Sequence, residues 1–190
     1  MGSGEGQLEW DMDMIMFIQE IHQQGGWNFV ECVISHHPLQ DISTVTWLFF
    51  IWNVVEFGFP FLWIIVGNYI VVKTCNYTCQ TKRPIDVLKS IRTFHTDPDT
   101  MGFPSLETHL AIVVLYPTFE HSSSSLLQGC ILMYIVFLGF TRIYAGVRFP
   151  SQIAYSWITG TVGILLGYHG HMKLQEYTWP RNVHLFLFIF

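Results

Sequence analysis

Charge is the scarcest property of this 190-residue sequence: only 12% of its residues are Asp, Glu, Lys or Arg. Soluble proteins average about 25%. Apolar residues make up 51% of the chain and aromatic residues 16%. This balance excludes intrinsic disorder, which combines low hydrophobicity with high net charge. The net charge of −5 excludes nucleic acid as an expected partner, because no extended basic face can neutralise a phosphate backbone. We therefore expect membrane lipids to surround one domain.

Metal ligands in a recognisable arrangement are also lacking. The four cysteines are too few and too scattered for a disulfide framework, and they are Cys32, Cys75, Cys79 and Cys130. Nine histidines are present, but the closest groups, His36-His37 and His169-Gly170-His171, lack the i, i+4 spacing that places two ligands on one helix face. The sequence predicts neither a metal site nor a cofactor.

Basic residues are absent from the first part of the chain, since the first one is Lys73. Residues 42–72 form a run of 31 residues that contains a single formal charge, Glu56. A helix rises about 1.5 Å per residue and roughly 20 residues cross a bilayer, so this run is long enough for one span but too short for two. Pro60, after Gly58, predicts a kink or a local break within it, and a run that bends back at Pro60 would change the number of crossings by one.

The rest of the chain alternates between a polar loop and shorter apolar stretches. Residues 73–104 carry five bases and are expected to form the main loop, and three apolar stretches follow at 106–119, 126–140 and 153–168. The first two are short enough to be core helices of a soluble protein. The long run and the shortage of charge favour the membrane. The sequence thus predicts an all-α, multi-pass integral membrane bundle over residues 42–168, with about four transmembrane helices and a tail at 169–190.

Residues 1–41 are acidic and are expected to include an amphipathic helix. Met12, Ile15 and Met16 favour one side of that helix, which would lie on the membrane surface or pack against the bundle. With four crossings, this segment lies on the side opposite to the loop at 73–104. Most bases then lie on the loop side, which therefore faces the cytoplasm or an equivalent compartment.

Three segments meet at the loop-side ends of the predicted helices: Lys82-Arg83-Pro84, Gly102-Phe103-Pro104-Ser105, and the stretch from Arg142 to Arg148. Ser105 follows a proline and precedes an apolar helix, so it is a candidate N-cap. Arginines beside a helix N-terminus form a site for an anion, and they suit phosphate through paired hydrogen bonds. On composition alone, the same bases could equally anchor helix ends at lipid headgroups.

The spacing of these segments resembles that of the type 2 phosphatidic acid phosphatase superfamily, which also includes bacterial acid phosphatases and vanadium haloperoxidases. The signature of that family is K-x6-R-P, then P-S-G-H, then S-R-x5-H-x3-D. Here Arg83-Pro84, Pro104-Ser105 and Thr141-Arg142 match parts of the three motifs, and the resemblance covers roughly residues 45–168. It implies a helical fold that binds the phosphate of a lipid substrate.

The positions that carry the chemistry in that family have changed. The resemblance implies a histidine nucleophile oriented by an aspartate, but Arg148 and Gln152 occupy these two positions. A guanidinium offers no lone pair at neutral pH and cannot replace an imidazole as nucleophile. Glu107 stands where the second motif has the histidine that protonates the leaving group, and Asn76 stands where the first motif has lysine.

These substitutions predict a catalytically inactive member of the fold that acts as a structural or accessory subunit beside other membrane proteins. The retained cations indicate a site for a lipid-phosphate headgroup, with Arg83, Ser105, Arg142 and Arg148 as binding residues and Lys82 beside them. The alternative is an active lipid phosphate phosphatase with a rebuilt site in which His109, four residues after Ser105, is the nucleophile.

Overall fold

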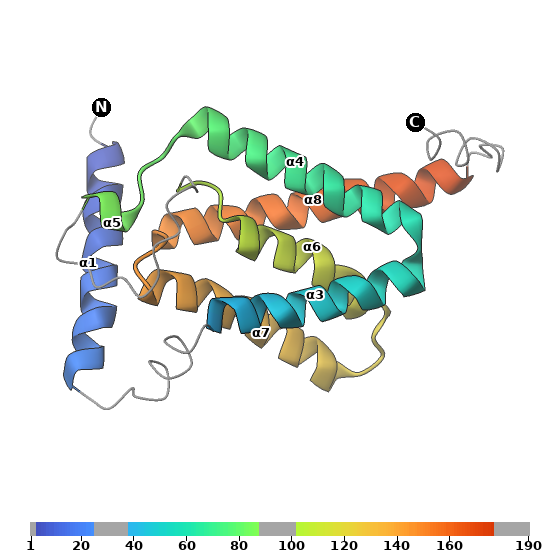
Figure 1. The fold of residues 1–190 in the computed structure, drawn as a ribbon, viewed down its shortest axis with the longest axis horizontal. Helices are drawn as coiled ribbons and strands as arrows, with labels where there is room; N and C mark the ends of the chain where they lie inside the picture. The colour runs from blue at the N-terminus through green and yellow to red at the C-terminus, as the bar shows by residue number, and fades with distance from the viewer. Residues whose placement is uncertain (1–2, 25–37, 88–101, 177–190) are drawn as a thin grey trace.

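The protein is described from a computed structural model that covers residues 3–24, 38–87 and 102–176. Within these ranges every regular element is an α-helix, which confirms the predicted all-α class (Figure 1). The helices are α1 (Ser3–Gln24), α3 (Pro38–Phe57), α4 (Phe59–Cys79), α5 (Pro84–Val87), α6 (Leu106–His121), α7 (Ser125–Tyr144) and α8 (Pro150–Glu176).

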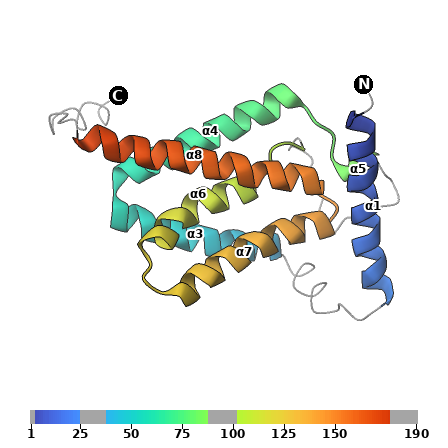
Figure 2. The same cartoon turned by 180° about the vertical axis from the view of Figure 1, so that it is seen from behind.

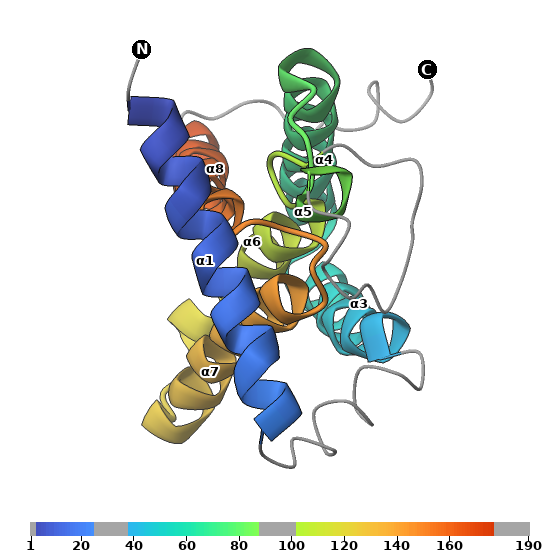
Figure 3. The ribbon, with the colours of Figure 1, turned by 90° about the vertical axis from the view of Figure 1, so that its left-hand side faces the viewer.

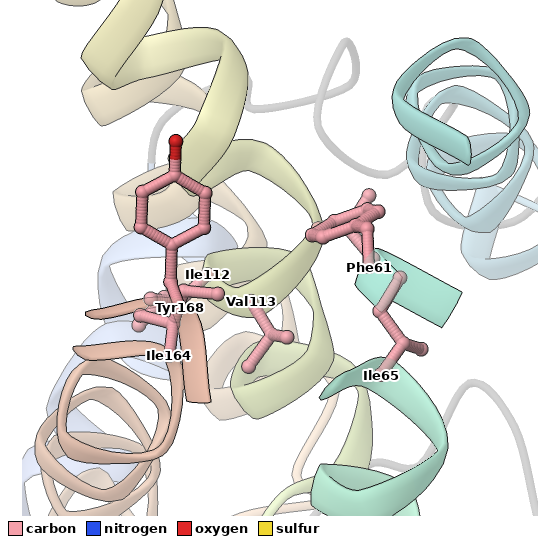
Figure 4. Close-up of a cluster of buried hydrophobic side chains, with 7 residues drawn as sticks. Phe61, Ile65, Ile112, Val113, Ile164 and Tyr168 are labelled. Carbon is pink, nitrogen blue, oxygen red and sulfur yellow. The ribbon is translucent and has the colours of Figure 1, made fainter. Parts of the chain in front are cut away.

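Helix α6 lies at the centre of the bundle and packs against α3, α4, α7 and α8 (Figures 1 and 2). The main buried cluster joins three of these helices. It comprises Phe61 and Ile65 of α4, Ile112, Val113 and Val114 of α6, and Ile164 and Tyr168 of α8. Figure 4 shows the α6 side chains between those of the other two helices. Each fully buried side chain of this size contributes about 1.5–3 kcal/mol of transfer free energy.

Residues 42–72 do not form the single kinked span that their length predicts. They belong to two antiparallel helices, α3 and α4, which meet at Gly58. Gly58 has φ 75°, a conformation that a glycine adopts without steric cost, and this allows the chain to reverse. Pro60 lies in the first turn of α4, where its missing N–H leaves no helical hydrogen bond unmade. The proline therefore starts a helix and does not kink one.

This reversal changes the expected count and boundaries of the helices. Five long helices form the described bundle, where the sequence predicted about four. Helix α4 continues to Cys79, so residues 73–79 of the expected loop are helical. The bundle helices begin at Pro38 and end at Glu176, which places the expected boundaries at 41/42 and 168/169 inside α3 and α8. The apolar end of the predicted tail lies outside the described residues.

Helix α1 crosses the end of the bundle where α7 ends and α8 begins (Figure 3). Ile15 is fully buried there in a cluster with Phe149, whereas Met16, expected on the same face, is exposed. The Gln19 amide donates a hydrogen bond to the carbonyl oxygen of Tyr144 at 3.1 Å. The helical prediction is confirmed for residues 3–24, and the contacts show packing against the bundle.

The end of the bundle occupied by α1 is also where α4 ends and α6 begins (Figures 1 and 3). The expectation that the acidic N-terminal segment and the basic loop lie on opposite sides is therefore wrong for α1. The error follows from treating α3 and α4 as one helix, because each additional reversal of the chain moves the preceding segment to the other end of the bundle. Residues 1–41 contain no Lys or Arg, so their new position leaves the distribution of bases between the two ends, and the orientation predicted from it, unchanged.

Length and hydropathy single out one helix in the described ranges, Ser125–Tyr144, as able to cross a membrane. A shorter apolar stretch, Val45–Phe57, lies within α3.

Candidate functional site

Three buried arginines gather at the end of the bundle that α1 covers. Arg83 lies just before α5, Arg142 in the last turn of α7, and Arg148 in the connection between α7 and α8. Arg142 is 6% exposed and Arg148 only 1% exposed. Burial of charge on this scale requires partners that compensate for lost hydration. The side chain of Lys82, predicted to lie beside the site, is exposed.

The partner shared by two of these arginines is the carboxylate of Glu107 in the first turn of α6. Its Oε1 lies 3.8 Å from Nη1 of Arg142, and its Oε2 lies 4.0 Å from Nη2 of Arg148. The Ser105 hydroxyl donates a hydrogen bond to Oε2 at 3.1 Å. Glu107 therefore connects the start of α6 to the two cationic residues on either side of the α7–α8 turn. The sequence marks Glu107 as a changed motif position, but no local pattern predicts its ion pairs, because both arginines lie on other elements.

Ser105 occupies the N-cap position of α6, as predicted, but its hydroxyl makes no capping hydrogen bond to the helix backbone. The hydroxyl instead donates its hydrogen bond to the Glu107 carboxylate. The backbone N–H of Ser105 donates to Oγ of Ser156 in α8 at 2.7 Å. This buried contact fixes the start of α6 against α8. Ser156 lies one helical turn after Gln152, so its position on the same face of α8 was the available sequence signal.

The α7–α8 turn folds Arg148 back onto Arg142. The backbone N–H groups of Val147 and Arg148 both donate to the carbonyl oxygen of Arg142, at 3.2 and 3.3 Å. Gly146 has φ 68°, which a residue with a side chain rarely adopts. The glycine thus permits the tight turn that brings both guanidinium groups to the same carboxylate.

Helix α1 holds this turn from outside. The buried carboxylate of Asp11 accepts hydrogen bonds from the backbone N–H of Ser151, at 3.1 Å, and from the Ser151 hydroxyl. A carboxylate at a helix N-terminus satisfies free backbone donors and is favoured by the helix dipole. Asp11 therefore caps α8 from another helix. No local sequence pattern predicts this contact, because 140 residues separate the two partners.

A cavity of about 370 Å³ lies beside the Glu107–Arg142 pair, between α3, α4, α6 and α7. Its walls are mainly apolar, and they comprise Thr46, Trp47 and Phe50 of α3, Leu62, Ile65, Val66 and Tyr69 of α4, Leu106, Glu107, Leu110 and Val114 of α6, and Leu138 and Arg142 of α7. Its size falls within the range of about 300–1,000 Å³ typical of small-molecule sites. The cavity thus joins the ion pair to the apolar interior of the bundle.

Two comparisons with known proteins bear on this arrangement. A family model described as the PAP2 superfamily matches residues 57–176, which is more than half of the chain. The chain belongs to the PAP2 superfamily. The fold is also similar to that in the crystal structure of Aquifex aeolicus LpxE, with a TM-score of 0.56. That chain is 21% identical, and the match covers 72% of the present chain and 91% of LpxE. At this identity the similarity shows a shared fold alone. No curated protein matches the chain.

Two positions where this chain differs from the PAP2 signature carry amides that hold backbone segments together. Gln152, at the aspartate position, donates from Nε2 to the Lys82 carbonyl at 3.1 Å and accepts from the backbone N–H of Phe149 at 3.1 Å. Asn76, at the lysine position, has its amide against the carbonyl oxygens of Phe103 and Pro104, to which its nitrogen can donate. A carboxylate at Gln152 would lack the donor for Lys82.

His109, the alternative nucleophile in this PAP2 member, lies within the helix bundle. Its Nε2 is 3.1 Å from Oδ1 of Asn68 in α4, and its Nδ1 is 3.1 Å from Oγ1 of Thr159 in α8. Asn68 uses its own nitrogen to donate to the carbonyl oxygen of Ile64, so its Oδ1 is the group that accepts from His109. Both ring nitrogens are therefore engaged, and the residue is 2% exposed. His109 does not line the cavity beside Glu107.

Metal-binding chemistry has no visible basis in the part of the chain described here. No group of three or more His, Cys, Asp or Glu side chains in those ranges is placed to hold an ion. Cys75, Cys79 and Cys130 are free thiols.

Proposed function

We propose that this chain is a non-catalytic member of the PAP2 superfamily that serves as a membrane-embedded accessory or structural subunit. The observation that carries the proposal is the ion pairing of Glu107 with both Arg142 and Arg148. A carboxylate of the protein itself lies on Arg142, which matches the arginine of the third motif, and on Arg148, the cation at the nucleophile position. The two residues at the acid and nucleophile positions thereby stabilise each other.

The chemistry of the replaced groups supports the absence of phosphoryl transfer. A guanidinium has no nucleophilic lone pair at neutral pH, so Arg148 cannot form a covalent phosphoryl intermediate. The Gln152 side chain forms hydrogen bonds with two backbone groups, and it does not orient a nucleophile as the aspartate of the signature would. Groups that act as a catalytic unit lose most of their rate advantage when one is removed. Here the nucleophile, its orienting partner and the general acid are all replaced.

The position of His109 weighs against a rebuilt phosphatase. A nucleophile must approach phosphorus with a free lone pair, yet both His109 nitrogens contact side chains on neighbouring helices. It is buried between α4 and α8 and does not line the cavity beside Glu107. The His109 contacts are instead suited to holding three helices together.

The distribution of polar and apolar side chains supports a membrane environment. Val55 is 80% exposed and Leu166 is 73% exposed, whereas Asn53 is completely buried. Asn53 donates to the carbonyl oxygen of Val114 at 2.8 Å and accepts from the hydroxyl of Thr118 at 2.9 Å. An apolar exterior around a hydrogen-bonded polar interior suits a lipid solvent, in which exposed polar groups would be unsatisfied. We propose a multi-pass membrane protein on this basis.

A phosphate headgroup fits the arginines less well than the sequence predicts. It would have to displace Glu107, and two anions at one pair of arginines repel each other. We therefore propose that the arginines mainly hold α6 against the α7–α8 turn. What remains of the PAP2 fold is then a rigid bundle with an apolar exterior, which is the property a membrane subunit requires.

The test is an assay of phosphate release from phosphatidic acid, lysophosphatidic acid and sphingoid phosphate by the purified full chain. We expect no release above that of a detergent blank. Release that is lost in His109→Ala would overturn the proposal. Mild detergent extraction tests the second part, because a subunit should be recovered in a larger complex. Recovery as a monodisperse monomer would contradict the accessory role.

A further inference from the structure

Helix α1 carries a second apolar face besides the one that packs on the bundle. Its inner face holds Asp11, Ile15 and Gln19, which contact the end of α7, the start of α8 and the turn between them. Trp10 and Phe17 are seven residues apart and lie on the opposite face of a helix with 3.6 residues per turn. Their side chains are 52% and 63% exposed. The outer face of α1 is therefore apolar and uncovered in the single chain.

This outer face points along the bundle, away from the other helices. Figure 3 looks along the bundle and shows α1 in front of the ends of α7 and α8. In the membrane protein proposed above, α1 lies across the bundle at one surface of the bilayer, with its inner face turned toward the membrane. Lipid covers exposed side chains around the bundle, such as Val55 of α3, but it does not cover the outer face of α1. An apolar face left in water is typical of a site for another protein.

The apolar residues of the outer face have the spacing of a coiled-coil seam. Trp10, Met14, Phe17 and Ile21 follow one another at intervals of four, three and four residues, and we call them the outer seam. Ile21 is 38% exposed and Met14 is half-buried. Two heptads with this spacing fit a partner helix that lies along α1 and inserts its own apolar side chains between those of the seam.

Acidic residues border the outer seam. Asp13 and Glu20 directly precede Met14 and Ile21, and both acids are exposed. They occupy positions beside the seam whose charges select the partner of a coiled coil. Residues 1–41 contain no Lys or Arg that could neutralise them. A helix with Lys or Arg beside its own apolar seam is the complementary partner.

We propose that the outer seam binds a basic amphipathic helix of another protein. The inference rests on the proposed accessory function and names the face by which the subunit attaches. A second copy in the same bilayer turns its own α1 outward in the same direction, so the two outer faces cannot meet. An anionic lipid surface is disfavoured as the occupant, because Asp13 and Glu20 are repelled by it.

The first experiment measures the complex that mild detergent extracts from native membranes. Trp10→Gln combined with Phe17→Gln removes the two most exposed residues of the outer seam. Glutamine is a good helix former, and the inner contacts of Asp11 and Ile15 are untouched, so α1 should stay in place. We expect the fraction of the chain recovered in the complex to fall at least about tenfold, because buried aromatic residues dominate the affinity of many interfaces.

Leu8→Gln combined with Met16→Gln is the matched control. Both residues are exposed apolar residues of α1 outside the outer seam, and the complex should remain. Equal loss in the two double variants would overturn the assigned face. A complex that persists in the Trp10 and Phe17 variant would overturn the inference and leave the accessory function standing. A monomeric unsubstituted chain would overturn the accessory function itself, so the two failures are distinguishable.

A second experiment determines the chemistry of the partner. The photoreactive residue p-benzoylphenylalanine replaces Phe17, native membranes are irradiated, and mass spectrometry of the peptides locates the crosslinked residue. We expect that residue in another protein, in a segment whose apolar residues repeat at intervals of three and four with Lys or Arg beside them. A crosslink to lipid, to a copy of this chain or to a segment without bases would overturn the inference, as would the absence of a crosslink.

Reversal of the acidic charges tests their role in selecting the partner. Asp13→Lys combined with Glu20→Lys places like charges opposite the expected bases of the partner helix. The fraction recovered in the complex should fall at least about tenfold, since like charges across an interface repel strongly. An unchanged complex would overturn the basic character assigned to the partner.

Discussion

Glu107 Oε2 lies 4.0 Å from Nη2 of Arg148, which ion-pairs the residue at the PAP2 acid position with the residue at the nucleophile position. The two substitutions thereby compensate for each other. Arg148 is 1% exposed, and an isolated cation buried to this extent would be strongly destabilising. The carboxylate at position 107 partly offsets that cost. In the function proposed above, this coupling replaces an external anion with an internal contact between α6 and the α7–α8 turn.

The first prediction concerns this coupling. Glu107→Ala should lower the free energy of unfolding by about 1–3 kcal/mol, because it leaves two buried guanidinium groups without their carboxylate. The measurement is thermal unfolding in detergent. In a double-mutant cycle, Glu107→Ala with Arg148→Met should lose less than the sum of the single losses, since removing both charges leaves neither uncompensated. Additive losses would show that the two residues are not coupled.

The second prediction concerns repair of the catalytic pair. Arg148→His combined with Gln152→Asp restores the histidine and the aspartate of the family signature, but we expect no phosphate release from phosphatidic acid. Glu107 still stands in place of the general acid, and Gln152→Asp loses the donor to the Lys82 carbonyl. Gln152→Glu controls for side-chain length without the donor. Phosphate release by the double variant would show that the rest of the site is still catalytic.

The third prediction separates a structural from a catalytic role for His109. His109→Ala should lower the free energy of unfolding by about 1–3 kcal/mol, because the side chains of Asn68 and Thr159 lose a buried partner. Phosphate release from phosphatidic acid should be equally absent in the variant and in the unsubstituted chain, since His109 does not line the cavity. An unchanged unfolding temperature, or phosphate release that only the unsubstituted chain shows, would contradict this role.

The fourth prediction tests the close packing of α8 against α4. A Cβ added at Gly163 would lie within van der Waals overlap of Oδ1 of Asn68, so Gly163→Ala should destabilise the bundle and disturb the contact between Asn68 and His109. Gly67→Ala on α4 is the control, since a Cβ there meets nothing within 4 Å. The control should gain about 0.5–1 kcal/mol from reduced backbone freedom. Equal effects of the two substitutions would contradict the packing.

The helical class and the family could be predicted from local sequence. The apolar runs predict helices, and Arg83-Pro84, Pro104-Ser105 and Thr141-Arg142 mark the three motif segments, whose family the later comparison confirms. The number of helices could not be predicted from run length, because Gly58 reverses the chain inside a continuous apolar run. Hydropathy reports which residues avoid water but does not report the direction of the backbone.

For the candidate site, too, some features follow from the sequence and others depend on the tertiary structure. The sequence by itself determined that Arg148 and Gln152 stand at the histidine and aspartate positions of the family signature, and the chemistry of a guanidinium and an amide does not depend on the fold. Only the tertiary structure decided that Glu107 pairs with Arg142 and Arg148, that Asp11 caps α8, and that His109 lies between α4 and α8. The physical reason is that these contacts join residues from separate helices, and their distances depend on how the helices pack.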